Sequence, residues 1–220
     1  MTGRITALIV GVLALAVTAV TMGEGTRAEA PLGHGHGHGA DHGEAKAAAP
    51  ALPPNTPGFP EIKGGDFRLV DGQGRVRTAK NPAGRPQLLF FGYANCQAIC
   101  SVALPRMARA VEELDRQGVT LTPVLITVDP ARDTVATLEP ALRKHHPRFV
   151  GLTGADDALR AAYRAFQVDR KVVFTHPDYG DVYAHGSYIY LLSADGRFLT
   201  LLPPVLGPER IAEVVKGYLE

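Results

Sequence analysis

The chain contains two cysteines, Cys96 and Cys100, which are four positions apart. An apolar run at residues 88–93 comes before them, and a stretch with helical periodicity follows at residues 101–117. Side chains at positions i and i+4 lie on one face of a helix, so the two thiols are expected to meet in space. Such a pair can close a disulfide or bind a thiophilic metal ion.

A structural disulfide is the simplest alternative. Closing so short a loop stabilises a fold by only about 2 kcal/mol in the chain-entropy treatment, and a chain of 220 residues can bury a core without it. Reactive or metal-binding cysteines are therefore the prediction. A strand-to-helix junction favours this chemistry, because free backbone N–H groups and the helix dipole stabilise a thiolate there.

Hydrophobic periodicity predicts the elements that position these thiols. Strands are expected at residues 67–70, 75–78, 87–93, 119–128, 149–152, 188–192 and 198–202, and helices at residues 101–117, 134–145, 156–166 and 208–219. The first two strands form an N-terminal β-hairpin, and the last two form a late inserted β-hairpin. This order is typical of an α/β, thioredoxin-like fold, a mixed sheet flanked by helices.

The composition is that of an ordinary globular protein, with 45% hydrophobic residues, 20% charged residues and a net charge of +1. The near-zero charge and the absence of a basic stripe with interleaved aromatic residues argue against a nucleic-acid partner. No glycine-rich phosphate loop follows a predicted strand. The cysteine pair is therefore the main candidate for a functional site.

The N-terminus has the order of a secretory signal. Arg4 precedes an apolar run at residues 5–22, and Ala30 ends a small-residue cleavage site. The run is about 18 residues long, which also suits a membrane anchor. We expect export to the periplasmic side of a bacterial inner membrane, either soluble after cleavage near Ala30 or anchored by residues 5–22. In an oxidising compartment the two thiols form a disulfide unless a metal or a reductant intervenes.

Residues 31–57 are rich in His, Gly, Ala and Pro and are expected to form a disordered linker between residues 1–30 and a folded domain at residues 58–220. Alternating imidazoles in such a segment can bind a borderline metal ion weakly. The histidines concerned are His34, His36, His38 and His42.

Three motifs together resemble the SCO/SenC family from about Gly58 to the C-terminus. They are FGYANCQAIC at residues 91–100, TVDPARDT at residues 127–134 and HGSYIYL at residues 185–191. Members of this family are thioredoxin-like, membrane-associated copper chaperones for the CuA centre of cytochrome c oxidase.

The resemblance implies that Cys96, Cys100 and His185 form a copper site. Two soft thiolates and an imidazole suit trigonal Cu(I), and the same set holds Cu(II) with an added ligand. It also implies that the partners are the CuA-bearing oxidase subunit and other copper carriers or thiol reductants. The resemblance favours a metallochaperone over an enzyme, with thiol–disulfide oxidoreductase activity as the enzymatic alternative.

The chain departs from the family pattern near the cysteines. Gln97, Ala98 and Ile99 replace the common Pro-Asp-Val, Ser101 replaces a proline, and Ala184 replaces an aspartate before the histidine. The loss of carboxylates weakens the binding of a harder ion such as Cu(II) more than the binding of a soft ion such as Cu(I). We therefore expect a bias toward Cu(I) or toward thiol chemistry.

Two other functions fit the same cysteines. A thiol–disulfide reductase would keep the apo-CuA cysteines reduced, with Cys96 attacking and Cys100 resolving. A redox or copper sensor would act on a signalling partner. In the motif at residues 127–134, Asp133 and Thr134 are expected to cap a helix and Arg132 to pair with a neighbouring carboxylate, and Asp129, Arg132 and Asp133 could also shape a loop that docks a partner.

Overall fold

The computed structural model describes residues 62–80, 84–186 and 188–220. The predicted signal or anchor at residues 1–30, the linker at residues 31–57 and the predicted domain start at Gly58 lie outside the described residues. Within the described part, none of the helices combines the length and hydrophobicity that crossing a bilayer requires.

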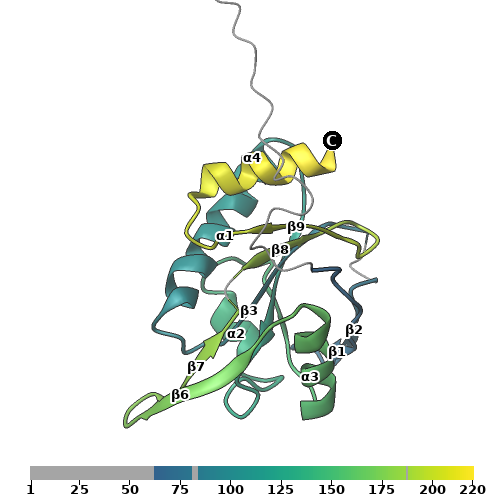
Figure 1. The fold of residues 1–220 in the computed structure, drawn as a ribbon. Coiled ribbons are helices and arrows are strands. Elements are labelled where there is room, and N and C mark those ends of the chain that lie inside the picture. Colours follow the sequence, from purple (N-terminus) through teal and green to yellow (C-terminus); the bar gives the residue numbers. More distant parts are fainter. Residues whose placement is uncertain (1–61, 81–83, 187) are drawn as a thin grey trace, which may run out of the picture. The chain divides into compact units, whose positions relative to one another are not determined.

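The centre of the fold is a five-stranded mixed sheet with the strand order β5-β4-β3-β8-β9 (Figure 1). Its strands are β3 (Gln87–Gly92), β4 (Thr122–Thr127), β5 (Val150–Leu152), β8 (Ile189–Leu192) and β9 (Phe198–Leu202). The first three are parallel, whereas β8 runs antiparallel to both β3 and β9. The predicted mixed sheet is thereby confirmed.

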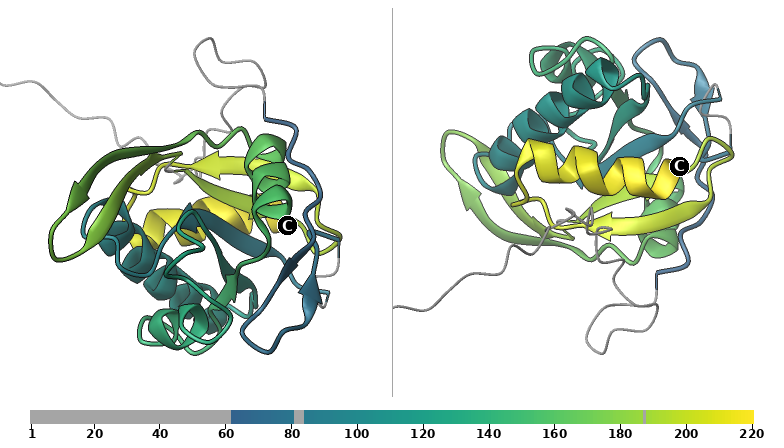
Figure 2. Two further views of the ribbon diagram at one scale, coloured as in Figure 1. Left: turned by 90° about the horizontal axis from the view of Figure 1, so that it is seen from below. Right: turned by 90° about the horizontal axis from the view of Figure 1, so that it is seen from above.

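Helices cover both faces of this sheet (Figures 1 and 2). Helices α1 (Ile99–Arg116) and α4 (Pro208–Leu219) contact each other on one face, and α3 (Asp156–Ala165) lies on the other. The short helix α2 (Leu138–Leu142) packs against β5.

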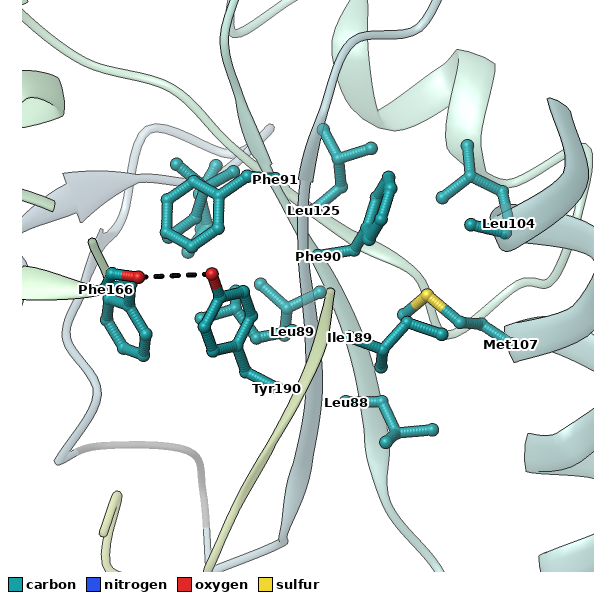
Figure 3. Close-up of a cluster of buried hydrophobic side chains, with 14 of the residues drawn as sticks. Leu88, Leu89, Phe90, Phe91, Leu104, Met107, Leu125, Phe166, Ile189 and Tyr190 are labelled. Atoms are coloured by element: carbon teal, nitrogen blue, oxygen red, sulfur yellow. Dashed lines mark hydrogen bonds between the residues drawn. The ribbon is translucent and has the colours of Figure 1, made fainter. Parts of the chain in front are cut away.

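Strand β3 lies in the middle of the hydrophobic core, and all of its residues are buried. Its side chains alternate between the two faces, as the period of a strand requires. Leu88 and Phe90 point toward α1 and Met107, whereas Leu89 and Phe91 point toward Tyr190 (Figure 3). The Tyr190 hydroxyl donates a 3.1 Å hydrogen bond to the backbone oxygen of Phe166, which satisfies its polar group within the core.

Two small hairpins accompany the sheet. The predicted N-terminal hairpin is present but short, with strands β1 (Leu69–Val70) and β2 (Val76–Arg77). The second hairpin consists of β6 (Arg170–His176) and β7 (Gly180–His185), which pair only with each other. It projects beside the start of α1 (Figures 1 and 2). This hairpin was not predicted from the sequence, because neither of its strands has an alternating buried face.

One predicted helix is much shorter than expected. Residues 134–145 were predicted to be helical, but only Leu138–Leu142 form helix α2. The expected cap, Asp133, instead accepts hydrogen bonds from Thr127 and from the backbone of Ala94. These tertiary contacts hold the segment before α2 in turns, so the predicted role of Asp133 as an N-cap is wrong.

Candidate metal centre

The two cysteines follow β3, at the edge where the parallel strands end. Cys96 lies in a turn ahead of α1, where its backbone N–H donates a 3.3 Å bond to the oxygen of Tyr93. Cys100 lies in the first turn of α1. The expectation that both occupy one helix face is therefore wrong in its geometry. The turn brings the thiols together, and both are free and buried, with exposed fractions of 6% for Cys96 and 1% for Cys100.

His185 reaches the cysteines from the far end of the chain. It is the last residue of β7, and its Nε2 lies 3.9 Å from the Sγ of Cys100. The ligand atoms of Cys96, Cys100 and His185 all lie within 4.8 Å of one another. Among the described residues, these three are the metal-binding types of side chain that lie close enough together to share one ion.

The imidazole of His185 is oriented by its surroundings. Its Nδ1 lies 3.0 Å from the backbone oxygen of Gly186. A carbonyl oxygen can only accept, so Nδ1 carries a proton, and Nε2 is the ring nitrogen that faces the thiols. The rings of Phe90 and Tyr93 meet the imidazole edge to face, each with centroids 6.1 Å away. A proton on Nδ1 and this ring plane are what metal ligation through Nε2 requires.

The end of β3 is shaped to receive a sulfur atom. A Cβ added to Gly92 would lie 2.9 Å from the Sγ of Cys100 and 2.9 Å from the ring of Phe90. Since real Cβ atoms do not approach other atoms so closely, the absence of a side chain at Gly92 makes the space that the Cys100 thiol occupies.

The two thiols differ in acidity. The thiol of Cys100 donates a hydrogen bond to Cys96, and this bond, with a hydrogen bond from His185 and the backbone N–H groups of Cys100 and Ala98, lowers the pKa of Cys96 well below its usual range. The same bond, with burial and the charge of Cys96, raises the pKa of Cys100. In the metal-free pair, the shared hydrogen bond therefore favours the thiolate on Cys96 and the proton on Cys100.

Two thiolates and one imidazole form a soft donor set. The ligand group contains no carboxylate, and the aromatic rings of Phe90 and Tyr93 flank the imidazole. Burial raises the pKa of Tyr93 to about 12, so this phenol adds no charge at neutral pH. Such a site suits a soft ion of low coordination number.

Within the described residues, no further histidine belongs to this group of ligands. His34, His36, His38 and His42 are outside the described residues. His176, near the tip of the β6–β7 hairpin, accepts a 3.1 Å bond from the backbone of Asp178. Sequence reasoning missed Tyr183, which packs edge to face on Tyr93, and Tyr93 in turn packs on His185.

Comparison with known proteins shows the family of the chain. The profile of the family described as SCO1/SenC matches residues 55–220. An SCO2-like protein of Rickettsia felis is 34% identical over 155 residues, which cover 70% of this chain and 76% of the relative.

Two solved structures with copper bound are also similar. Arabidopsis thaliana ScoI is 30% identical with a TM-score of 0.67, and the match covers 71% of this chain and 98% of that protein. Bradyrhizobium japonicum ScoI is 32% identical with a TM-score of 0.64, and the match covers 72% and 100%. The predicted thioredoxin-like fold is confirmed by these neighbours.

Proposed function

The chain belongs to the SCO1/SenC family, and we propose that it is a copper chaperone that delivers copper to the CuA site of cytochrome c oxidase during assembly. The single observation that carries the proposal is the convergence of Cys96, Cys100 and His185 within 4.8 Å. Two similar proteins, the ScoI proteins of Arabidopsis and Bradyrhizobium, have been solved with copper bound.

In this proposal copper is cargo, and the three residues hold it. Cys96 offers a thiolate that is already formed, Cys100 gives up its proton when the ion binds, and His185 contributes the Nε2 lone pair. The cysteines are fixed to the buried strand β3, whereas His185 is carried by a separate hairpin. A partner that supplies its own thiolates can take the ion stepwise, with His185 as the ligand that is exchanged first.

The donor set favours Cu(I) over Cu(II). Gln97 and Ala98 stand exposed between the cysteines, and Ala184 is exposed before His185, so none of these three positions offers a carboxylate. A Cu(II) affinity equal to the Cu(I) affinity would contradict this proposed preference.

The test is an anaerobic Cu(I) titration of the reduced protein against a chromogenic chelator. Because His34, His36, His38 and His42 can bind copper themselves, all four are replaced by alanine in every protein compared. One copper per chain, held more weakly after Cys96→Ala or His185→Ala, is the expected result. No competitive binding would refute the copper site.

Delivery is tested separately. The copper-loaded protein is mixed with the purified, metal-free CuA-bearing domain of the oxidase, and formation of the CuA centre is followed by its absorption. Transfer by the parent protein and loss of transfer by His185→Ala are expected. Retention of full transfer by His185→Ala would remove the histidine from the proposed mechanism.

One observation favours a second function, a thiol–disulfide reductase. The Cys96 thiolate lies beside the protonated Cys100, which is the arrangement of an attacking and a resolving thiol. Cys96 would attack a partner disulfide and form a mixed disulfide. Cys100 would then lose its proton and attack Cys96, releasing the partner as a dithiol and leaving a Cys96–Cys100 disulfide for an external thiol reductant to reset. His185→Ala separates the functions, because it removes a copper ligand but neither thiol.

We also propose export with the N-terminal segment either cleaved near Ala30 or kept as an anchor at residues 5–22. The sequence order of Arg4, the apolar run and the small residues before Ala30 supports both forms. The mass of the protein recovered from the exported fraction distinguishes them, and recovery of the protein only from the cytoplasm would refute export.

A further inference from the structure

The loop between β4 and α2 touches both halves of the candidate metal centre. It follows β4, the parallel neighbour of β3, so it leaves the sheet beside the loop that carries the cysteines. Asp129 and Asp133 in this loop are buried. Buried carboxylates are costly unless they are paired or hydrogen-bonded, and their partners here lie on two separate segments.

Asp133 holds the cysteine side. Its Oδ2 accepts a 3.1 Å hydrogen bond from the backbone N–H of Ala94, two residues before Cys96. The same oxygen accepts a 2.7 Å bond from the hydroxyl of Thr127 at the end of β4. The cysteine loop is thus tied to the sheet through this carboxylate.

Arg132 holds the histidine side. Its guanidinium donates to the carboxylate of Asp129 and to the backbone oxygens of Tyr179 and Asp181, the last over 2.6 Å. A Cβ added to Gly180 would lie 2.5 Å from Nη1 of Arg132, so the guanidinium lies directly on the hairpin backbone. A planar fork of donors suits several acceptors at once in a way that an ammonium group does not.

Other contacts join the hairpin to the same loop. The hydroxyl of Tyr183, two residues before His185, donates a 3.2 Å bond to Oδ1 of Asp129. Arg170, which pairs with His185 in the ladder, donates to the backbone oxygen of Val128 and stacks 4.4 Å from the ring centroid of Tyr183. The hairpin has no strand paired with the central sheet, so side-chain contacts such as these hold it against the rest of the domain.

We propose that Arg132, acting through Asp129 and the hairpin backbone, is a positioning residue that keeps His185 within reach of the two thiols. With the Arg132 contacts, the ion meets two thiolates and one imidazole. Without them, the hairpin moves and the ion keeps the two thiolates alone. This inference rests on the proposed copper-binding function, and no part of it requires Arg132 to touch the metal.

The variant that isolates this role is Arg132→Lys. It keeps a positive charge near the buried Asp129 but cannot donate to that carboxylate and to two hairpin oxygens together. The matched control is Arg106→Lys, because Arg106 also ties a loop through a carbonyl, donating over 3.4 Å to Pro204, and does so away from the β6–β7 hairpin.

The decisive experiment is a double-variant comparison of Cu(I) affinity in the protein lacking the linker histidines. Arg132→Lys is expected to weaken binding by about 10-fold, as for residues that orient a ligand, and His185→Ala by more. The protein with both changes should bind no more weakly than His185→Ala alone, because in this proposal the effect of Arg132 on the metal passes through the position of His185. An additive loss, or no loss in Arg132→Lys, would overturn the proposal.

Hydrogen exchange of the metal-free protein gives a readout that does not depend on copper. Arg132→Lys should speed exchange of the β7 amides while leaving those of β3 unchanged, and Arg106→Lys should leave both unchanged. Equal acceleration throughout the protein would mean a general loss of stability and would overturn the positioning role.

A milder variant, Tyr183→Phe, removes only the bond to Asp129. It should also speed hydrogen exchange of the β7 amides, but by less than Arg132→Lys does. If β7 exchange is unchanged in both variants, the proposal that these contacts hold the hairpin in place is refuted. If the parent protein does not bind Cu(I), the proposed function fails, whereas the exchange experiment still decides whether Arg132 holds the hairpin.

Discussion

The two halves of the candidate metal centre are built in opposite ways. The cysteine half follows β3, whose residues are all buried, and the thiols lie within the hydrophobic core. The histidine half is a two-stranded hairpin outside the central sheet, and Val173 and Phe174 on it are 60% and 52% exposed. Burial holds the thiols, whereas the imidazole is held by the polar contacts of its hairpin and by the rings of Phe90 and Tyr93. A site of this kind can keep a metal on one half while the other half releases it.

The largest expected difference between the halves is in stability. Phe91→Ala removes a buried ring that packs against Tyr163, Phe166 and Tyr190, and it should lower the free energy of unfolding by about 3–5 kcal/mol. Val173→Ala, on the exposed hairpin, should change it by less than about 0.5 kcal/mol. Denaturant unfolding of the metal-free protein measures both. Similar losses would show that the hairpin is part of the core.

The second prediction compares the ligands. Cys100→Ser replaces a buried thiolate ligand by a hard, protonated hydroxyl, and it should weaken Cu(I) binding on the order of 1,000-fold, or about 4 kcal/mol. His185→Ala should cost less, about 100-fold or 2.7 kcal/mol. Chelator competition gives both values. If His185→Ala weakens Cu(I) binding more than Cys100→Ser does, the expectation that the cysteine half contributes more to copper affinity is wrong.

The third prediction concerns the space at the end of β3. Gly92→Ala places a Cβ 2.9 Å from the Sγ of Cys100 and 2.9 Å from Phe90. We expect a loss of about 1–3 kcal/mol in the free energy of unfolding from overpacking, together with weaker Cu(I) binding as the thiol is displaced. The control is Gly217→Ala, where an added Cβ meets nothing within 4 Å. Unchanged stability and copper affinity in Gly92→Ala would contradict the close fit of this thiol.

The fourth prediction is the pH dependence of copper binding. The pKa of Cys96 is lowered and the pKa of Cys100 is raised, so near neutral pH the metal-free pair holds one proton, which binding releases. The affinity for Cu(I) should therefore increase with pH, by about tenfold between pH 7 and pH 8, where free imidazole is mostly neutral. Two thiols of ordinary pKa would give about a hundredfold increase in Cu(I) affinity over the same range, and that result would refute the difference in pKa between Cys96 and Cys100.

The same contrast explains what the sequence could predict. The central strands and the cysteine pair were predictable, because burial leaves a hydrophobic pattern and the thiols are close in sequence. His185 lies 85 positions beyond Cys100, so it came from the family resemblance, which the comparisons support.

The hairpin carrying His185 was missed for a physical reason. Its first strand is exposed along most of its length and contains a bulge between Val172 and Phe174, so no period of two marks it. The run of β-branched residues and the turn at Pro177–Gly180 were the available signals. Asp133 was misread as a cap because its real partners, Ala94 and Thr127, are set by tertiary structure.

In the proposed function, a buried cysteine pair and a histidine on a separate hairpin bind one copper ion together. X-ray absorption at the copper edge of the Cu(I)-loaded protein without the linker histidines measures this ligand set. Two sulfur ligands and one nitrogen ligand are predicted, with the nitrogen lost in His185→Ala. Two sulfurs alone in the parent protein would contradict the account.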